Sequence, residues 1–68
     1  MTKNIKKQYV SLLDNQRGLL DNIVSGLSSH AKKTKDPHER RVLVLLNAAS
    51  RKVGEAATEA RNIPETDS

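Results

Sequence analysis

The sequence predicts an all-α protein, an antiparallel two-helix hairpin, and three features of the chain lead to this prediction. Apolar residues recur in steps of three and four along both halves, which is the spacing of one face of an α-helix. Asp36 and Pro37 mark a helix start, because aspartate suits the N-cap and proline suits the first helical position. Glu39, three residues after Asp36, is a third signal, since it resembles the reciprocal partner of a capping box. The linker before this start is short, so the two helices must be antiparallel neighbours.

The first helix is expected from about residue 4 to about residue 31. Its apolar residues follow a heptad row that comprises Tyr9, Leu13, Gln16, Leu20, Ile23 and Leu27. Further apolar residues flank this row on both sides, at Ile5, Leu12, Leu19, Val10 and Val24. The apolar stripe is therefore wider than a two-stranded coiled coil requires, and it indicates a helix that touches two neighbours.

Gln16 is the polar member of this row. One interpretation is a partly exposed or self-paired polar residue, which is common in short helical bundles. The other is a polar layer between subunits that sets their register, as a buried asparagine does in coiled coils. The sequence leaves both interpretations open.

The second helix is expected from residue 37 to about residue 62, after a linker over 32–36 and before a polar tail over 64–68. Its heptad row comprises Val42, Leu46, Ala49, Val53, Ala56, Ala60 and Ile63. Pro64 ends it, because proline disfavours helical geometry in the residue before it. The segment 42–46 is apolar on every side, which predicts burial on every side. The alanine-rich second half would let another helix approach closely.

Two helices alone bury only one line of contact, and this sequence supplies more apolar surface than that. An exposed surplus would mark an interface. The predicted protein interface comprises Leu12, Leu19, Leu43, Val44, Ala56 and Ala60. We expect two hairpins to pair into a four-helix bundle as a homodimer. Docking of one hairpin on a different protein, and a loose hairpin that orders only on binding, are the alternatives.

Length and composition limit the class of protein. A chain of 68 residues forms one domain with little core. The chain has no cysteine, which excludes disulfides and thiolate metal sites. Its longest apolar run spans five residues, whereas a membrane span needs about 20, and no apolar signal-peptide region follows the N-terminal lysines. We expect a soluble, cytoplasmic protein.

Little in the sequence indicates catalysis, a cofactor or a metal. Ser28, Ser29 and His30 are adjacent, but no rigid pocket is available to orient a nucleophile and its base. Asp14 and Asp21 share a helix face at a separation of about 10 Å, too far for a shared proton. His30 and His38 flank the linker, yet they match no known metal-ligand spacing. We therefore expect no enzyme, no cofactor and no small-molecule substrate.

The expected function is that of a non-enzymatic protein-interaction module, an adaptor, inhibitor or regulator that acts through apolar helix surfaces. The alternative is a small basic nucleic-acid-binding regulator, since the formal charge of +4 suits anionic partners. Its candidate contacts lie around the linker, at Lys32, Lys33, Lys35, Arg40 and Arg41. We call these five residues the basic tip. A solvated tip whose lysines complement the helix C-terminus also explains them, and it is the favoured interpretation because runs of charge are usually solvated.

Overall fold

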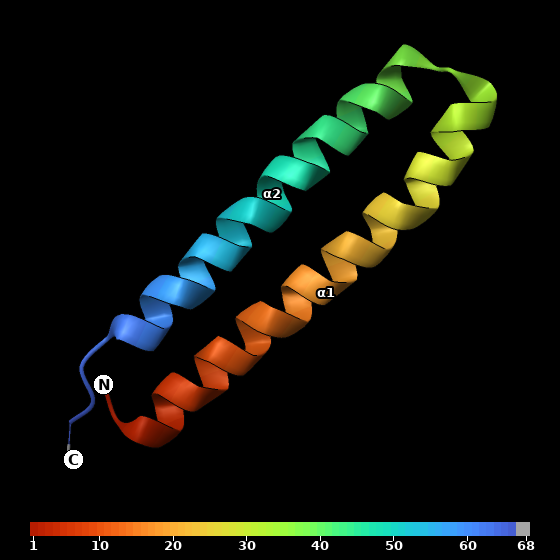
Figure 1. The fold of residues 1–68 in the computed structure, drawn as a ribbon. Coiled ribbons are helices and arrows are strands. Elements are labelled where there is room, and N and C mark those ends of the chain that lie inside the picture. Colours follow the sequence, from red (N-terminus) through yellow and green to blue (C-terminus); the bar gives the residue numbers. More distant parts are fainter. Residues whose placement is uncertain (67–68) are drawn as a thin grey trace.

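The computed structural model describes residues 1–66, which form two long α-helices that pack side by side (Figure 1). Helix α1 spans Lys3–Thr34 and helix α2 spans Pro37–Asn62. They run antiparallel, with both chain ends at one end of the hairpin and the loop at the other (Figure 1). The molecule measures 54 × 14 × 11 Å, so it is a single layer of two helices. The predicted all-helical hairpin is confirmed.

Helix α1 is longer at its C-terminus than the sequence predicts. It continues through Thr34, so the loop contains only Lys35 and Asp36. Lys35 adopts the left-handed conformation with φ of 55°, and its N–H donates to the carbonyl of Ala31 at 2.9 Å. The lysines near the predicted end remain helical, because this C-cap satisfies a carbonyl of the last turn.

The start of α2 agrees with the prediction in two of its three signals. The Asp36 carboxylate accepts a hydrogen bond from the backbone N–H of His38 at 2.7 Å, and Pro37 is the first helical residue. Glu39 does not complete a capping box. It accepts a hydrogen bond from the Thr34 hydroxyl at 2.5 Å and lies 3.2 Å from Nδ1 of His30. Glu39 therefore joins the two helices across the loop.

The line along which the helices touch differs from the predicted heptad rows. On α1 it comprises Lys6, Val10, Leu13, Arg17, Leu20, Val24, Leu27 and Ala31. On α2 it comprises Glu39, Leu43, Leu46, Ser50, Val53, Ala57 and Ala60. We call these residues the contact row, and all but Arg17 are buried or half-buried. In each helix, every second residue of the predicted row lies in the contact row. At the positions between them, the contact row contains the next residue along the chain instead of the predicted one.

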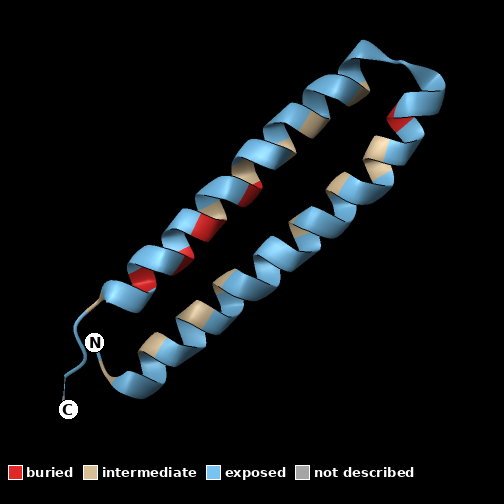
Figure 2. Ribbon diagram, in the orientation of Figure 1, coloured by how far each residue is buried: buried red, intermediate tan, exposed pale blue. Residues whose placement is uncertain are grey.

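The core is thin and is built from small residues. The buried residues are Ala31, Ser50, Gly54, Ala57 and Ala60 (Figure 2). No large side chain among residues 1–66 is fully buried. Small residues allow the two backbones to approach closely, whereas the larger members of the contact row keep one side in solvent. This hairpin therefore buries less than its apolar residues would allow.

The end opposite the loop is closed by the two ends of the described chain. The N–H of Thr66 donates to the carbonyl of Met1 at 2.9 Å, and Thr2 and Thr66 form an isolated β-bridge. Residues 64–66 of the predicted polar tail thus lie against the N-terminus, and residues 67–68 lie outside the described residues. Neither α1 nor α2 has the length and apolar character that crossing a bilayer requires.

Candidate protein-interaction surface

The two sides of the hairpin are defined by their offset from the contact row. Successive residues of an α-helix are rotated by about 100°, since 3.6 residues make one turn. In an antiparallel pair, residues that directly precede the contact row fall on one side of the hairpin in both helices. Residues that directly follow it fall on the other side. The sequence and the contact row therefore assign each flanking residue to a side.

The side that precedes the contact row is mainly apolar, and its exposed polar members are Gln16, His30, His38, Lys52 and Glu59. It carries Ile5, Tyr9, Leu12, Leu19 and Ile23 of α1 with Val42, Leu45, Ala49 and Ala56 of α2. We call these nine residues the apolar face. Its seven large side chains are between 43% and 58% exposed. Isolated exposed apolar residues are normal in proteins, whereas larger apolar patches are the kind of surface that interaction sites use.

The side that follows the contact row is polar, and the structure closes it with cross-helix bonds. It carries Lys7, Asp14, Asp21 and Ser28 of α1 with Arg40, Asn47, Gly54 and Arg61 of α2. We call these eight residues the polar face. Asp14 and Arg61 form an ion pair at 2.7 Å, and the buried Ser50 hydroxyl of the contact row donates to Asp21 at 2.6 Å. These bonds confirm the assignment of sides independently of the periodicity.

Arg17 is the exposed member of the contact row, and Gly54 makes room for it. A Cβ added at Gly54 would lie 2.7 Å from a guanidinium nitrogen of Arg17. The arginine therefore crosses α2 at this glycine and reaches the surface. The same contact places residue 17 level with residue 54, which fixes the register of the two helices.

The six residues of the predicted interface divide into three groups. Leu12, Leu19 and Ala56 lie on the apolar face and are exposed. Leu43 and Ala60 lie in the contact row, where they pack within the hairpin. Val44 follows the contact row, and its 67% exposure sets it apart as a single apolar residue on the other side of α2. Sequence reasoning did not assign Tyr9, Ile23, Val42 and Leu45 to an outer surface.

The apolar segment 42–46 is not buried on every side, which corrects the prediction. Leu43 and Leu46 face α1, whereas Val42, Val44 and Leu45 are exposed. The physical reason is that one neighbouring helix covers one side only. The surplus that the sequence indicated therefore lies on the surface of the single hairpin.

The basic tip keeps its five cations in solvent. Lys32, Lys33, Lys35, Arg40 and Arg41 are exposed, and none of them takes part in a salt bridge within residues 1–66. The two acidic residues nearby bind elsewhere, since Asp36 caps α2 and Glu39 joins His30. The Asp36 side chain already occupies the N-terminus of α2, so an anion at the tip would rely on the side chains.

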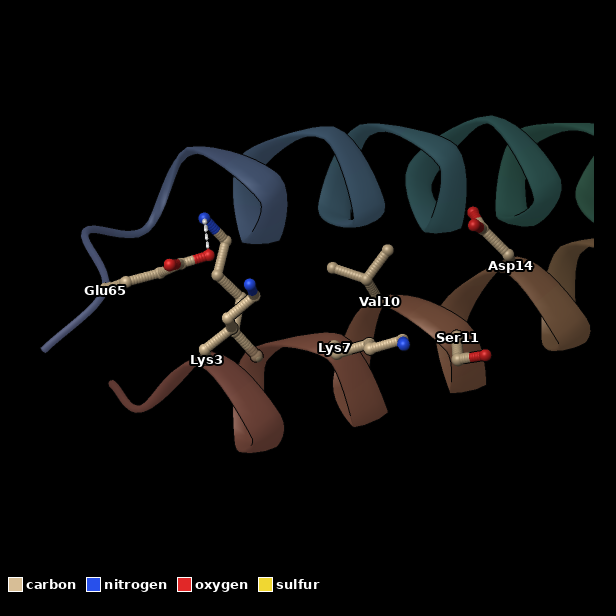
Figure 3. A pocket seen from close by; sticks show the side chains of 7 residues that line it. Lys3, Lys7, Val10, Ser11, Asp14 and Glu65 are labelled. Atoms are coloured by element: carbon tan, nitrogen blue, oxygen red, sulfur yellow. Dashed lines mark ion pairs between the residues drawn. The ribbon is translucent and has the colours of Figure 1, made fainter. Parts of the chain in front are cut away.

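The basic residues near the N-terminus line a hollow at the end of the hairpin opposite the loop. Its lining includes Lys3, Lys6 and Lys7 with Asp14 and Glu65 (Figure 3). The Lys6 ammonium lies 3.8 Å from the Glu65 carboxylate. These opposite charges lie on an open surface.

The remaining candidates for chemistry are engaged in structural contacts. Asp14 pairs with Arg61 and Asp21 with Ser50 rather than with each other. His30 meets Glu39 without His38, and residues 1–66 contain no group of three side chains that could hold a metal ion. In comparisons with known proteins, the chain matches no family model, and no curated protein or solved structure resembles it significantly. The apolar face is the surface that the geometry distinguishes most clearly.

Proposed function

We propose that this protein is a non-enzymatic protein-interaction module that acts through its apolar face, and that a second copy completes a four-helix bundle on it. The observation that carries the proposal is the stripe of exposed leucine, isoleucine, valine and tyrosine side chains along both helices. Burial of such side chains is the main driving force of association. The polar side chains of the other face already bond to each other or to the contact row within the chain. This supports association through the apolar face alone.

The surface area of the hairpin supports the same conclusion. A compact monomer of 7.5 kDa exposes about 4,250 Å² by the general relation between mass and surface. The hairpin exposes 5334 Å², an excess of about 1,100 Å². A standard interface buries about 800 Å² on each partner. The hairpin therefore has enough surplus surface to form one such interface.

The test compares two double variants that add the same charge at different places. Leu12→Lys with Leu19→Lys places two lysines on the apolar face. Asn15→Lys with Asn22→Lys places them on exposed positions of α1 away from it. We expect the native chain and the asparagine variant to associate in sedimentation equilibrium, and the leucine variant to remain a helical monomer.

The outcomes separate the possible partners. If the leucine variant associates as the native chain does, the apolar face is not the interface and the proposal is wrong. If the native chain is monomeric at high concentration, self-association is excluded and the face must bind a different protein. Capture of a host protein by the native chain but not by the leucine variant, in the presence of nuclease, would then identify it.

Nucleic-acid binding is the second candidate, and the five unpaired cations of the basic tip favour it. Lysine and arginine contacts with phosphates release counterions, so affinity for RNA or DNA should fall steeply with salt. The test is binding of a labelled duplex and a labelled single strand at low and at physiological salt, with Lys32→Ala, Lys33→Ala and Lys35→Ala combined as the variant. Absence of binding at low salt would exclude this function.

A further inference from the structure

The apolar face of α1 is arranged symmetrically about Gln16. Tyr9 and Ile23 each lie seven residues from Gln16, Leu12 lies four residues before it, and Leu19 lies three residues after it. Gln16 directly precedes Arg17 of the contact row, so it belongs to the same side of the hairpin as these residues, and it is exposed. At these four positions a helix with this spacing matches an antiparallel copy of itself, with large side chains opposite large side chains, whereas Ile5 lies opposite Gly26.

On α2 two charged residues have the same offsets about Ala56, whereas Val42 and Leu45 of the apolar face have no counterpart because α2 ends at Asn62. Lys52 lies four residues before Ala56 and Glu59 lies three residues after it, which repeats the offsets of Leu12 and Leu19. Both charged residues directly precede the contact row and are exposed. The contact between Arg17 and Gly54 places Gln16 level with Ala56 to within about one turn. The two sets of offsets therefore share one centre.

We propose that the second copy docks on the apolar face in antiparallel orientation, about a two-fold axis that passes by Gln16 and Ala56. This pairing rests on the proposed self-association and specifies its geometry. Leu12 then meets Leu19 of the second copy, and Tyr9 meets Ile23 of the second copy. Lys52 meets Glu59 of the second copy, and the two-fold axis repeats this ion pair. The two Gln16 side chains meet at the axis.

The positions of charged and apolar side chains favour this arrangement over a bundle in which both loops lie at the same end. In a bundle with both loops at the same end, α1 would lie against α2 of the second copy at the same level. Leu12 would then face Glu59 and Leu19 would face Lys52, which places apolar side chains against charges. In the antiparallel arrangement, leucine faces leucine and lysine faces glutamate. Opposite charges directly across an interface suppress wrong pairings and fix the register.

The paired glutamines add a second restriction on register. An amide carries both donors and acceptors, so two Gln16 side chains can satisfy each other at the axis. A shift by one heptad would place each amide against apolar side chains and leave it unpaired, at a cost in free energy. A single polar layer acts in this way in coiled coils, where it sets register and oligomeric state. Gln16 is therefore a specificity-determining residue of the interface.

Cysteine cross-linking tests the geometry directly, because the chain contains no cysteine of its own. Gln16→Cys should oxidise to a disulfide-linked dimer with a mild oxidant, since the two sulfur positions meet at the axis. Leu12→Cys alone should not form a disulfide-linked dimer, because the two copies of residue 12 lie about 10 Å apart in the direction of the helix axes. A mixture of Leu12→Cys and Leu19→Cys should cross-link. Asn15→Cys, exposed away from the apolar face, is the matched control.

The charged pair supplies a second measurement that introduces no cysteine. Lys52→Glu or Glu59→Lys should each raise the dissociation constant of the dimer about tenfold, and the double variant should restore it. Cross-linking between Gln16→Cys and Ala56→Cys, with none between two copies of Gln16→Cys, would overturn the antiparallel arrangement. The dimer and the proposed function would stand in that case. A monomeric native chain would overturn the arrangement together with self-association.

Discussion

The two sides of this hairpin differ in how they are completed. The polar face is bonded within the chain, since Asp14 reaches Arg61 and Asp21 reaches Ser50. The apolar face has the same two helices beneath it and no cover. The comparison shows that one contact row can serve two purposes. It joins the helices, and it directs most of their remaining apolar side chains to one side, with Val44 as the exception.

The largest effect expected on the polar face comes from Asp21→Ala. Ser50 is 5% exposed, and its hydroxyl loses its acceptor in this variant. A buried polar group left unpaired costs about 1–3 kcal/mol of unfolding free energy. Urea denaturation followed by circular dichroism measures the loss. Asp21→Ala combined with Ser50→Ala should recover most of it. An unchanged midpoint for the single variant would show that this bond does not hold the polar face together.

Protein concentration should affect stability through the apolar face. If a second copy covers this face, each tenfold increase in concentration stabilises the folded dimer by about 1.4 kcal/mol. Thermal unfolding at three concentrations should then give midpoints that rise together with concentration. The variant with Leu12→Lys and Leu19→Lys should show one midpoint throughout. A concentration-independent native midpoint would contradict the difference between the two sides.

Two glycines allow a matched comparison within the helices. A Cβ at Gly18 would meet nothing within 4 Å, so Gly18→Ala should raise the unfolding free energy by about 0.5–1 kcal/mol through helix propensity alone. Gly54→Ala gains the same propensity but displaces the Arg17 guanidinium, so its net effect should be smaller. Equal stabilisation by both substitutions would show that the Arg17 crossing is unimportant.

The smallest effect should come from the ion pair of the polar face. The Asp14 and Arg61 side chains are about half exposed, at 48% and 51%. Asp14→Asn should therefore cost only about 0.2–1 kcal/mol. The loss should shrink at high salt, because exposed charges are screened. A loss that does not change between 0.05 M and 1 M salt would indicate a role in packing instead.

Much of the fold was predictable from local signals. Asp36 and Pro37 gave the start of α2, and Pro64 gave its end, because capping and proline geometry depend on a few neighbouring residues. The end of α1 was harder, since a lysine in the left-handed conformation at position 35 leaves no glycine signal. The loop is consequently shorter than expected.

The contact row was not predictable from apolar periodicity. Each helix carries two adjacent rows with the same heptad step, and periodicity cannot tell which one faces the partner helix. The structure selects the row that contains Arg17 and Ser50, because Ser50 bonds across the hairpin to Asp21 and Gly54, beside this row, makes room for Arg17. Paired polar residues and a matching glycine were the signal in the sequence that could have distinguished the two rows. The role of the apolar face stays a prediction until association is measured.

The β-bridge between Thr2 and Thr66 has a consequence for how the chain can be connected. Because Met1 and Thr66 are hydrogen-bonded to each other, a short peptide could join the two ends without disturbing either helix. New ends could then be opened between Lys35 and Asp36. Such a circular permutant would place α2 before α1 in the chain and should keep both sides of the hairpin. It would show that side-by-side packing specifies this molecule independently of the order in which its helices are synthesised.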